Sequence, residues 1–517
     1  MKLIVKPIEF ETGGKPILIM NKQDAEFLGL HSSDRVLIKS KKKKIISIID
    51  ISDKLVSPGE AGANIDLCTR LNIALGHSID VVAAGTPESV RFIKEKIQGR
   101  RLNYKKIKAI IEDVVERHLT DVELSAFITS LSIYGMSMDE TESLSKAMIQ
   151  TGKKIKLPGK KLVDKHGIGG CSGDTTSMVL VPTVAAAGLT IAKTSSRAIT
   201  SPAGTADKME ILAPVEFKID EIKKIIKKAN ACLVWGGTLD LAPADDTFVK
   251  IEYPLSIDPL MLPSIMSKKK AMGSKYLVID MPTGRGAKIK TVGAATSLAY
   301  DFIELGKRLG IHTACGITYG EQPIGYRIGP ALEAQEALLT LKGNGPKDLL
   351  EKVASLAGIL FEMVAKNHID GKKHALYLIK SGKAYKKMKQ IIEAQGGDPN
   401  IKPSDIEVGK KHVYVRSNKS GFVLWTKNAE IAAIAREAGA PKDKGAGLII
   451  NKKNGDKVKK GDILLIIYSN NSAKLDSALK LVKEYEPIVV GKSYEERLLL
   501  SKVPAKIPHK RIFLLER

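Results

Sequence analysis

The sequence predicts an α/β protein with four parts: a small N-terminal β-rich domain, an all-α domain, a large α/β domain with a mixed sheet, and a C-terminal α+β part. The length of 517 residues suffices for about three structural units of roughly 100–200 residues. Hydrophobic residues make up 44% of the chain and charged residues 27%, which is typical of a globular protein. The apolar pattern changes from short runs to helical spacing, then to strands alternating with helices, and finally back to short runs.

The first 85 residues contain apolar runs that predict strands. Gly, Asp and Lys turns separate these runs, which read LIVKPIEF, KPILIM, DRVLIKS and KIISIID. From Tyr104 onward the spacing becomes helical, because Ile107, Ile110, Ile111 and Val114 share one helix face.

Two capping boxes predict the next helices. Thr120 pairs with Glu123, and Ser137 pairs with Glu140, each just before an amphipathic segment. The second of these helices is expected to end near Gly152, which completes an all-α unit.

The chain then alternates buried strands with helices, which is the pattern of an α/β domain. The predicted strands read KLVDK, TIAK, ACLVW and KYLVIDM. Residues 347–366 predict a long helix with Asp348 in its first turn. After about Ser404 the composition becomes β-rich again and leads through GDKVKKGDILLIIY to a charged tail.

The positive charge raises the question of nucleic-acid binding. The formal net charge is +25, and the isoelectric point is about 9.5. The lysines are scattered, however, and aromatic residues make up only 5% of the chain, which leaves few surfaces for base stacking. We therefore expect no nucleic-acid partner, because a cationic field equally attracts small phosphorylated substrates.

Cysteine usage and hydropathy predict a cytoplasmic protein. The four cysteines form no CxxC pair, which disfavours a zinc site or a disulfide framework. The N-terminus lacks the apolar run of a signal peptide. The uncharged stretch 175–192 has the length of a membrane span, but its hydroxyl residues and Pro182 favour a buried helix.

The segment 164–174 reads DKHGIGGCSGD and lies between a predicted strand and the uncharged helix. Its glycines let backbone N–H groups converge beside a helix N-terminus, which favours an anion site over a plain turn. Ser172 breaks the GxGxxG pattern, and no lysine follows Gly173 as in a P-loop. Lys165 stands at one rim, and Ser177 lies in the first helical turn.

A second polar loop, 194–210, reads TSSRAITSPAGTADKME and also leads into a helix. Its hydroxyls and amides suit phosphate or ribose, and Arg197 suits a bidentate anion contact. The alternative is an ordinary Ser/Thr-rich surface loop. Two such loops, each following a strand, predict one cleft at the carboxyl ends of a sheet.

Beyond residue 85 the chain resembles the nucleoside phosphorylases of the thymidine/pyrimidine type. The matching segments, in order, are 164–173, 195–210, 243–245, 264–269 and 438–447. The apolar runs indicate a β-rich domain at 1–85, and the resemblance implies a helical domain at 86–158 and 242–272, an α/β phosphate-binding domain at 159–241 and 273–403, and a C-terminal α+β domain at 404–517. The phrase GDKVKKGDIL also resembles lipoyl and biotinyl domains, so we expect a barrel-sandwich-like C-terminal part without a prosthetic group.

Within that family the chain resembles the archaeal-type AMP phosphorylases. They carry an additional N-terminal domain and have similar sequences in segments 193–201 and 280–288. Gly167 replaces a usual serine, and Glu252 stands near the place where an arginine that reads a pyrimidine is expected. Arg285 and Lys288 are basic residues that suit a 5′-phosphate. A nucleotide substrate therefore fits better than a nucleoside.

The resemblance implies a pentosyltransferase that catalyses reversible phosphorolysis of nucleoside 5′-monophosphates in nucleotide catabolism. AMP and phosphate would give adenine and ribose 1,5-bisphosphate. The alternative within the class is a thymidine or pyrimidine nucleoside phosphorylase. Outside the enzyme class, the alternative is a basic RNA- or DNA-binding protein.

The resemblance also implies roles for individual residues. Asp258 would be the catalytic proton donor to the leaving base. A free aspartate has a pKa of about 3.9, so we expect Asp258 to be desolvated by the apolar residues around it. The phosphate-binding residues would be Lys165, Ser177, Ser195 and Thr205. The substrate-binding residues would be Gly170, Ser196, Arg197, Ala198, Ile199, Thr200, Ser201, Thr205, Ser264 and Lys288.

We expect no metal and no cofactor, with inorganic phosphate as co-substrate, since the sequence has no HExxH or comparable cluster. The expected partners are small molecules, with no membrane contact. The resemblance implies a homodimer or a larger homo-oligomer. His166, beside the glycine-rich loop, is a candidate for orienting the substrate or for a structural hydrogen bond.

Overall fold

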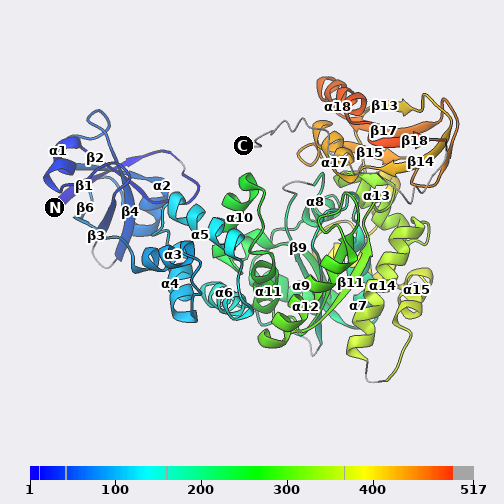
Figure 1. Ribbon diagram of the computed structural model, residues 1–517, viewed down its shortest axis with the longest axis horizontal. Coiled ribbons are helices and arrows are strands. Elements are labelled where there is room, and N and C mark those ends of the chain that lie inside the picture. The colour runs from blue at the N-terminus through cyan, green and yellow to red at the C-terminus, as the bar shows by residue number, and fades with distance from the viewer. Residues whose placement is uncertain (11, 41–42, 159–160, 199–200, 366, 493–517) are drawn as a thin grey trace, which may run out of the picture.

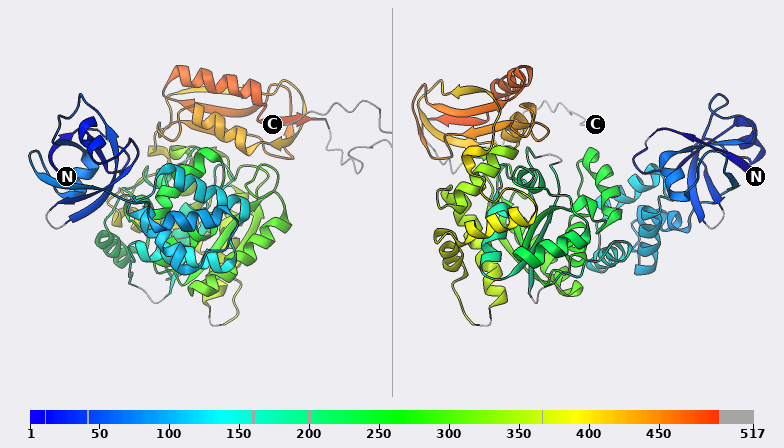
Figure 2. Two further views of the ribbon diagram at one scale, coloured as in Figure 1. Left: turned by 60° about the vertical axis from the view of Figure 1, so that its left-hand side comes forward. Right: turned by 180° about the vertical axis from the view of Figure 1, so that it is seen from behind.

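The computed structural model describes residues 1–10, 12–40, 43–158, 161–198, 201–365 and 367–492. Figures 1 and 2 show an elongated molecule with the N-terminal domain at one end and a helical domain beside it. The α/β domain occupies the middle, and the C-terminal domain packs on its far side.

The N-terminal domain is a closed barrel with the strand order β1-β5-β2-β4-β3-β6. Its strands are β1 (Lys2–Ile8), β2 (Ile17–Met20), β3 (Arg35–Ser40), β4 (Lys43–Ile51), β5 (Glu60–Asn64) and β6 (Ser78–Ala83), with helices α1 (Lys22–Phe27) and α2 (Ile65–Leu71). The four strands expected from apolar runs are present as β1 to β4. The barrel closes because β1 pairs with β5 in parallel and with β6 in antiparallel orientation.

The helical domain combines two stretches of the chain. Its helices are α3 (Glu88–Ile97), α4 (Tyr104–Val115), α5 (Asp121–Tyr134), α6 (Met138–Thr151), α10 (Pro243–Leu255) and α11 (Met261–Ala271). Both predicted capping boxes are formed, at Thr120 and at Ser137. Phe248 and Leu260 pack in the same apolar core as the first stretch, which brings the 242–272 segment back to this domain.

The central sheet has the order β11-β10-β7-β8-β9. Its strands are β7 (Leu162–Gly167), β8 (Thr190–Ser195), β9 (Ala231–Trp235), β10 (Tyr276–Thr283) and β11 (His312–Tyr319). We expected a mixed sheet, but every pairing among these five strands is parallel. Parallel neighbours need long connections, and here each connection contains at least one helix.

Helices cover both faces of this sheet, as Figure 1 shows. One apolar core joins the sheet to α7 (Thr176–Ala186), α13 (Pro330–Leu341), α14 (Lys347–Val364), α15 (Gly371–Lys380) and α16 (Lys383–Ala394). The other face carries α9 (Ile219–Ala229), α11 and α12 (Val292–Leu309). The short helices α8 (Thr205–Met209) and η1 (Gly236–Thr238) follow β8 and β9.

Helix α7 lies in the uncharged stretch and is buried along its length, as expected for a core helix. Among the described residues, no helix has the length and hydropathy that crossing a bilayer requires.

The C-terminal domain contains two small sheets and two helices. The sheets have the orders β12-β15-β17-β13 and β16-β14-β18. Their strands are β12 (Arg327–Ile328), β13 (Lys411–Arg416), β14 (Gly421–Thr426), β15 (Gly447–Ile450), β16 (Lys457–Val458), β17 (Ile463–Ser469) and β18 (Ile488–Gly491), with α17 (Asn428–Glu437), α18 (Ser472–Tyr485) and the short η2 (Pro403–Asp405). Strand β12 precedes α13 in the chain, so the α/β segment contributes an edge to this domain.

Candidate active site

The glycine-rich loop connects β7 to α7 at the carboxyl end of the sheet. Gly169, Gly170 and Gly173 have φ values of +85°, +91° and +69°, a region that favours glycine. A Cβ on Gly170 would lie 2.4 Å from the backbone nitrogen of Lys288. The loop therefore needs glycine both for its backbone conformation and for its close contact with the segment after β10.

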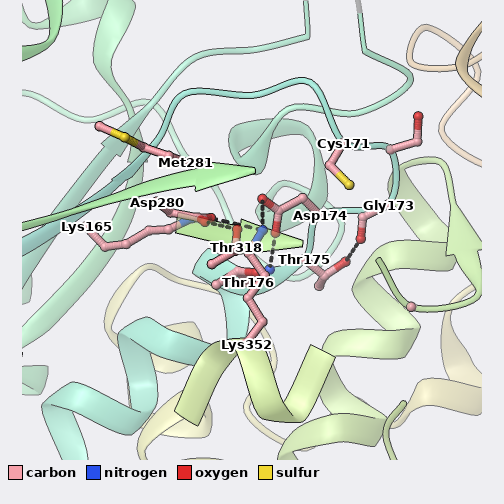
Figure 3. A network of polar contacts seen from close by, with 12 residues as sticks. Lys165, Cys171, Gly173, Asp174, Thr175, Thr176, Asp280, Met281, Thr318 and Lys352 are labelled. Atoms are coloured by element: carbon pink, nitrogen blue, oxygen red, sulfur yellow. Dashed lines mark hydrogen bonds and ion pairs between the residues drawn. The ribbon is translucent and has the colours of Figure 1, made fainter. Parts of the chain in front are cut away.

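A buried network of charges lies beneath this loop, as Figure 3 shows. The Lys352 ammonium on α14 lies 3.1 Å from Asp280 and 3.5 Å from Asp174. The Lys165 ammonium lies 3.2 Å from the same Asp280 oxygen. Burial alone would raise the pKa of Asp174, but Lys352 and Lys165 hold that pKa well below its usual value. Lys165 thus stands beside the loop, within an ionic network.

A second buried pair ties helix α8 to the glycine-rich loop. The Lys208 ammonium lies 2.5 Å from Glu333 on α13. The same ammonium donates to the backbone carbonyl of Asp174, at 2.8 Å. Because Lys208 is one turn beyond Thr205, this contact fixes the start of α8 against the glycine-rich loop. The two predicted polar loops are therefore neighbours in space.

Arg197 binds carboxylates of its own chain. Its guanidinium donates two hydrogen bonds to Glu210, at 2.7 and 2.9 Å, and one to Glu216, at 2.9 Å. It also lies over the ring of Trp235, 5.0 Å from the ring centroid. We expected this guanidinium to bind an anion, but these contacts engage it in holding the loop after β8 in shape.

A cleft of about 540 Å³ lies between the α/β domain and the helical domain. Of the predicted site residues, Ser195, Ser196, Arg197, Ala198 and Ser264 line it. The cleft lining does not include Lys165, Gly170, Ser177, Ser201, Thr205, Asp258 or Lys288. Ile199 and Thr200 lie outside the described residues.

Ser177 and Thr205 lie at helix starts beside the glycine-rich loop. Ser177 is buried in the first turn of α7, and Thr205 is the first residue of α8. Ser201 is half-buried and contacts the carbonyl of Ala203. The predicted phosphate-binding residues thus lie around the two loops. The cleft is lined by residues of the second loop and of α11.

Asp258 lies in the turn between α10 and α11, and its side chain is 37% exposed. Its carboxylate forms an ion pair with Lys288, which comes from the segment after β10. We expected apolar neighbours to desolvate Asp258, but Leu260 packs into the helical core and Met261 and Leu262 pack against the core around α12. Arg285, the other basic candidate, stacks on Trp425, 4.2 Å from its ring centroid.

Three regions match described protein families. Residues 90–152 match the helical bundle domain of a glycosyl transferase family, residues 159–385 match the a/b domain of that family, and residues 422–488 match the C-terminal domain of pyrimidine nucleoside phosphorylases. The fold is also similar to anthranilate phosphoribosyltransferase from Thermus thermophilus, at a TM-score of 0.51 and 19% identity over 59% of this chain and 98% of that one. At that identity the similarity shows the fold alone.

Relatives that match nearly the full length of the chain have much higher sequence identity. An AMP phosphorylase from Thermococcus kodakarensis is 52% identical over 94% of this chain and 97% of its own length. One from Thermofilum pendens is 44% identical over the full length of both chains. One from Methanosarcina mazei is 47% identical over 95% of this chain and 96% of its own. The chain belongs to the AMP phosphorylase family.

In this AMP phosphorylase family member, the cleft also contains the candidate His166 and two lysines that were not assigned a role from the sequence. His166, at the end of β7, and Lys268 and Lys269, on α11, line the same cleft. Burial lowers the pKa of His166 well below its usual value, and Lys193 and Lys269 lower it further. The ring is therefore neutral, and its buried Nδ1 has no hydrogen-bond partner in the part of the chain that the structure describes. Both lysines belong to the segment 264–269, SIMSKK, which is one of the segments that match the family.

Lys193 is a further buried cation behind the second loop. It lies on β8, and its side chain is buried. Its ammonium donates to the carbonyl of Thr194, at 3.2 Å, and makes no ion pair within the described ranges. Burial lowers the pKa of Lys193 well below its usual value, and Lys269 lowers it further. Lys193 is therefore a buried amine whose charged form is disfavoured until an anion lies beside it.

Glu252, which the sequence placed near the base, is a buried carboxyl on α10. Burial raises its pKa to about 7, and the nearby Asp258 carboxylate adds to this shift. No group of three or more His, Cys, Asp and Glu side chains suited to a metal ion occurs among the described residues.

Proposed function

We propose that the protein catalyses the reversible phosphorolysis of AMP, in which AMP and inorganic phosphate give adenine and ribose 1,5-bisphosphate. The observation that carries this proposal is identity of 44–52% with AMP phosphorylases over 94–100% of the chain. The additional N-terminal domain lies within those matches, since one of them covers the chain in full.

The geometry supports a reaction between two anionic groups and one sugar. The glycine-rich loop and the loop after β8 are fixed side by side by Lys208. Lys165 and Lys193 are buried near them, and an anion would stabilise the charged form of Lys193, which makes no ion pair among the described residues. We assign the attacking phosphate to this region, with Lys165, Ser177, Ser195 and Thr205 as its binding residues.

The nucleotide would occupy the cleft between the two domains. Ser264 and the loop that begins at Ser196 line this space. Gly170 packs against the backbone of Lys288, so the glycine-rich loop and the proposed 5′-phosphate residue lie together. Fixed donors of this kind act by positioning the reactants and by stabilising the charge that develops in the transition state.

In the reaction, a phosphate oxygen attacks the anomeric carbon while the bond to the purine nitrogen breaks. The electron pair of that bond goes to the purine, which needs a proton to leave as adenine. We assign this proton transfer to Asp258. General acid catalysis of this kind contributes about 10²–10⁴-fold to the rate.

We also propose that the enzyme acts in the cytoplasm as a homodimer or a larger homo-oligomer, without a resident cofactor. Its surface carries many lysines, in keeping with phosphorylated small molecules as partners. Light scattering after size-exclusion chromatography would test the assembly state, and a mass of 56.0 kDa, that of one chain, would contradict it.

Base release distinguishes this function from the pyrimidine alternative. The protein is incubated with phosphate and either AMP or thymidine, and the free base is measured by chromatography. We expect adenine from AMP and little thymine from thymidine. Release of thymine but not adenine would show that the substrate assignment is wrong, and binding to nucleic acid without release of either base would exclude the enzyme class.

A further inference from the structure

The proposed proton donor is engaged in an ion pair. Lys288 and Asp258 come from different domains, the α/β domain and the helical domain, and they meet between β10 and α11. A carboxylate bound to an ammonium has no proton to give. Some event must therefore separate this pair and supply a proton before Asp258 can act as an acid.

The position of Lys288 indicates that a bound phosphate group separates it from Asp258. Its side chain is 39% exposed, and its backbone packs on Gly170 in the anion-binding loop. A phosphate dianion is a stronger partner for an ammonium group than a single carboxylate is, because it carries more charge and more acceptor oxygens. A nucleotide brings such a group, whereas a nucleoside does not.

Glu252 is a buried carboxyl that contacts the turn carrying Asp258. It lies in the last turn of α10, is 7% exposed, and one carboxyl oxygen accepts the backbone N–H of Leu260 at 3.3 Å. Its own carbonyl accepts the N–H of Ile257, at 3.2 Å. Glu252 therefore holds both ends of the turn that carries Asp258.

The charges that face Glu252 come from every neighbouring element. Asp245 is on the same helix, Asp258 is on the turn, and Lys288 comes from the segment after β10. Lys268 on α11 also faces it, but that ammonium is paired with Asp245. Burial and the two nearby carboxylates raise the pKa of Glu252 more than the Leu260 N–H and Lys288 lower it, so this pKa lies at about 7.

We propose that the Lys288–Asp258 ion pair restrains the acid until the 5′-phosphate of a nucleotide binds Lys288, and that Glu252, as a positioning residue, then passes its proton to Asp258. The inference rests on the proposed function. When Lys288 moves to the phosphate, Asp258 loses its cation while the Glu252 carboxyl is still neutral. The O–H bond of Glu252 breaks, and the proton binds a carboxylate oxygen of Asp258.

The cycle is balanced in protons. Asp258 gives its proton to the purine as the glycosidic bond breaks, and adenine leaves neutral. Glu252 is then ionised and regains a proton from water, while product release returns Lys288 to Asp258. Through this ion pair, turnover as well as affinity depends on the 5′-phosphate of the substrate.

The ion pair is tested with Lys288→Ala and with AMP and adenosine as substrates. Wild type is expected to turn over AMP at least 10-fold faster than adenosine. The variant loses the preference for AMP over adenosine and gains adenosine turnover by about three- to fivefold, the strength of a partly exposed ion pair. Lys290→Ala is the matched control, because this neighbouring lysine donates to the carbonyl of Ala287. Adenosine turnover that stays equal or falls in Lys288→Ala would overturn the inference.

The proton path is tested with Glu252→Gln, whose amide oxygen can still accept the Leu260 N–H. In wild type, kcat for AMP falls as the pH rises through the pKa of Glu252. The variant loses this fall, and its kcat at pH 6 is lower by about 10²-fold. Glu112→Gln, an exposed carboxyl on α4, is the control and keeps the wild-type profile. A variant that retains the fall overturns the inference, whatever its rate.

Glu252→Asp keeps the test decisive if the glutamine variant does not fold. It retains a titratable carboxyl in a shifted position, so the fall in kcat is expected at a different pH. An unchanged position of the fall would overturn the inference. Wild type that releases no adenine from AMP would instead disprove the proposed function, and the inference with it; an active wild type with either contrary result disproves the inference alone.

Discussion

The Asp280 carboxylate at the end of β10 lies 3.1 Å from the Lys352 ammonium on α14, and both side chains are buried. This ion pair joins the sheet to the helix beneath the glycine-rich loop, as Figure 3 shows. Asp280 also accepts a hydrogen bond from the hydroxyl of Thr318 on β11, at 2.8 Å. Three elements under the proposed phosphate site therefore depend on one carboxylate.

Asp280→Ala is expected to lower the free energy of unfolding by about 3–5 kcal/mol, because it leaves the buried Lys352 and Lys165 without this counter-ion. Urea denaturation measures the change. Glu393→Ala serves as control, since Glu393 forms an exposed pair with Lys228 and the change there is expected within about 0.5 kcal/mol. Equal effects of the two substitutions would contradict the role assigned to the network.

Arg197→Lys is expected to destabilise the loop after β8 by about 1–2 kcal/mol, because lysine cannot make the bidentate contact to Glu210. Glu210→Gln is expected to cost a similar amount. In a double-mutant cycle the two costs are less than additive, since both remove the same contact. Full additivity, together with a loss of AMP affinity only in the Arg197 variant, would instead indicate that Arg197 binds substrate directly.

Asp258→Asn is expected to lower kcat for AMP phosphorolysis by about 10²–10⁴-fold, because asparagine cannot donate a proton to the purine. The KM for AMP is expected to change little if chemistry limits turnover. Steady-state kinetics of adenine release measures both constants. Wild-type turnover in this variant would remove Asp258 from the mechanism.

Glu336→Gln is expected to change the pH dependence of stability. Glu336 on α13 is 2% exposed, and burial raises its pKa to about 8. The folded protein therefore holds a proton there that the unfolded chain releases near pH 4.5, so wild-type stability falls as the pH rises from 4.5 to 8. The glutamine variant lacks this fall, which amounts to about 1.4 kcal/mol per pH unit.

Urea unfolding at pH 5, 7 and 9 tests this expectation. The variant and wild type are expected to be similar at pH 5, and the variant more stable at pH 9. Parallel curves at all three values would show that Glu336 does not control the dependence.

Much of the fold could be predicted from apolar spacing. The predicted strands KLVDK, TIAK, ACLVW and KYLVIDM are β7 to β10, and the helix predicted for 347–366 is α14. Strand β5, which reads EAGAN, was missed because it has small residues in place of an apolar run. Small residues are needed there, since a Cβ on Gly62 would lie 2.5 Å from the side chain of Ile8.

The site was harder to predict, because a sequence shows neighbours along the chain and not in space. Asp258 lies among apolar residues in sequence, yet they pack away from it and Lys288, 30 positions later, faces it. The Arg197 guanidinium could bind an anion, but it donates hydrogen bonds to Glu210 and Glu216, which follow α8 in the chain. The two polar loops are neighbours after β7 and β8, as expected, but the cleft is lined by the second loop and by no residue of 167–174, so the prediction of one shared cleft was wrong.

The identity of the group that forms the new bond to the sugar, phosphate or water, tests the central claim most directly. The protein is incubated with AMP and radiolabelled inorganic phosphate, and both the adenine released and the label in ribose 1,5-bisphosphate are measured. Phosphorolysis predicts one labelled sugar bisphosphate for each adenine and no adenine without phosphate. Adenine released without incorporation of label would show hydrolysis, and absence of adenine would show that AMP is not the substrate.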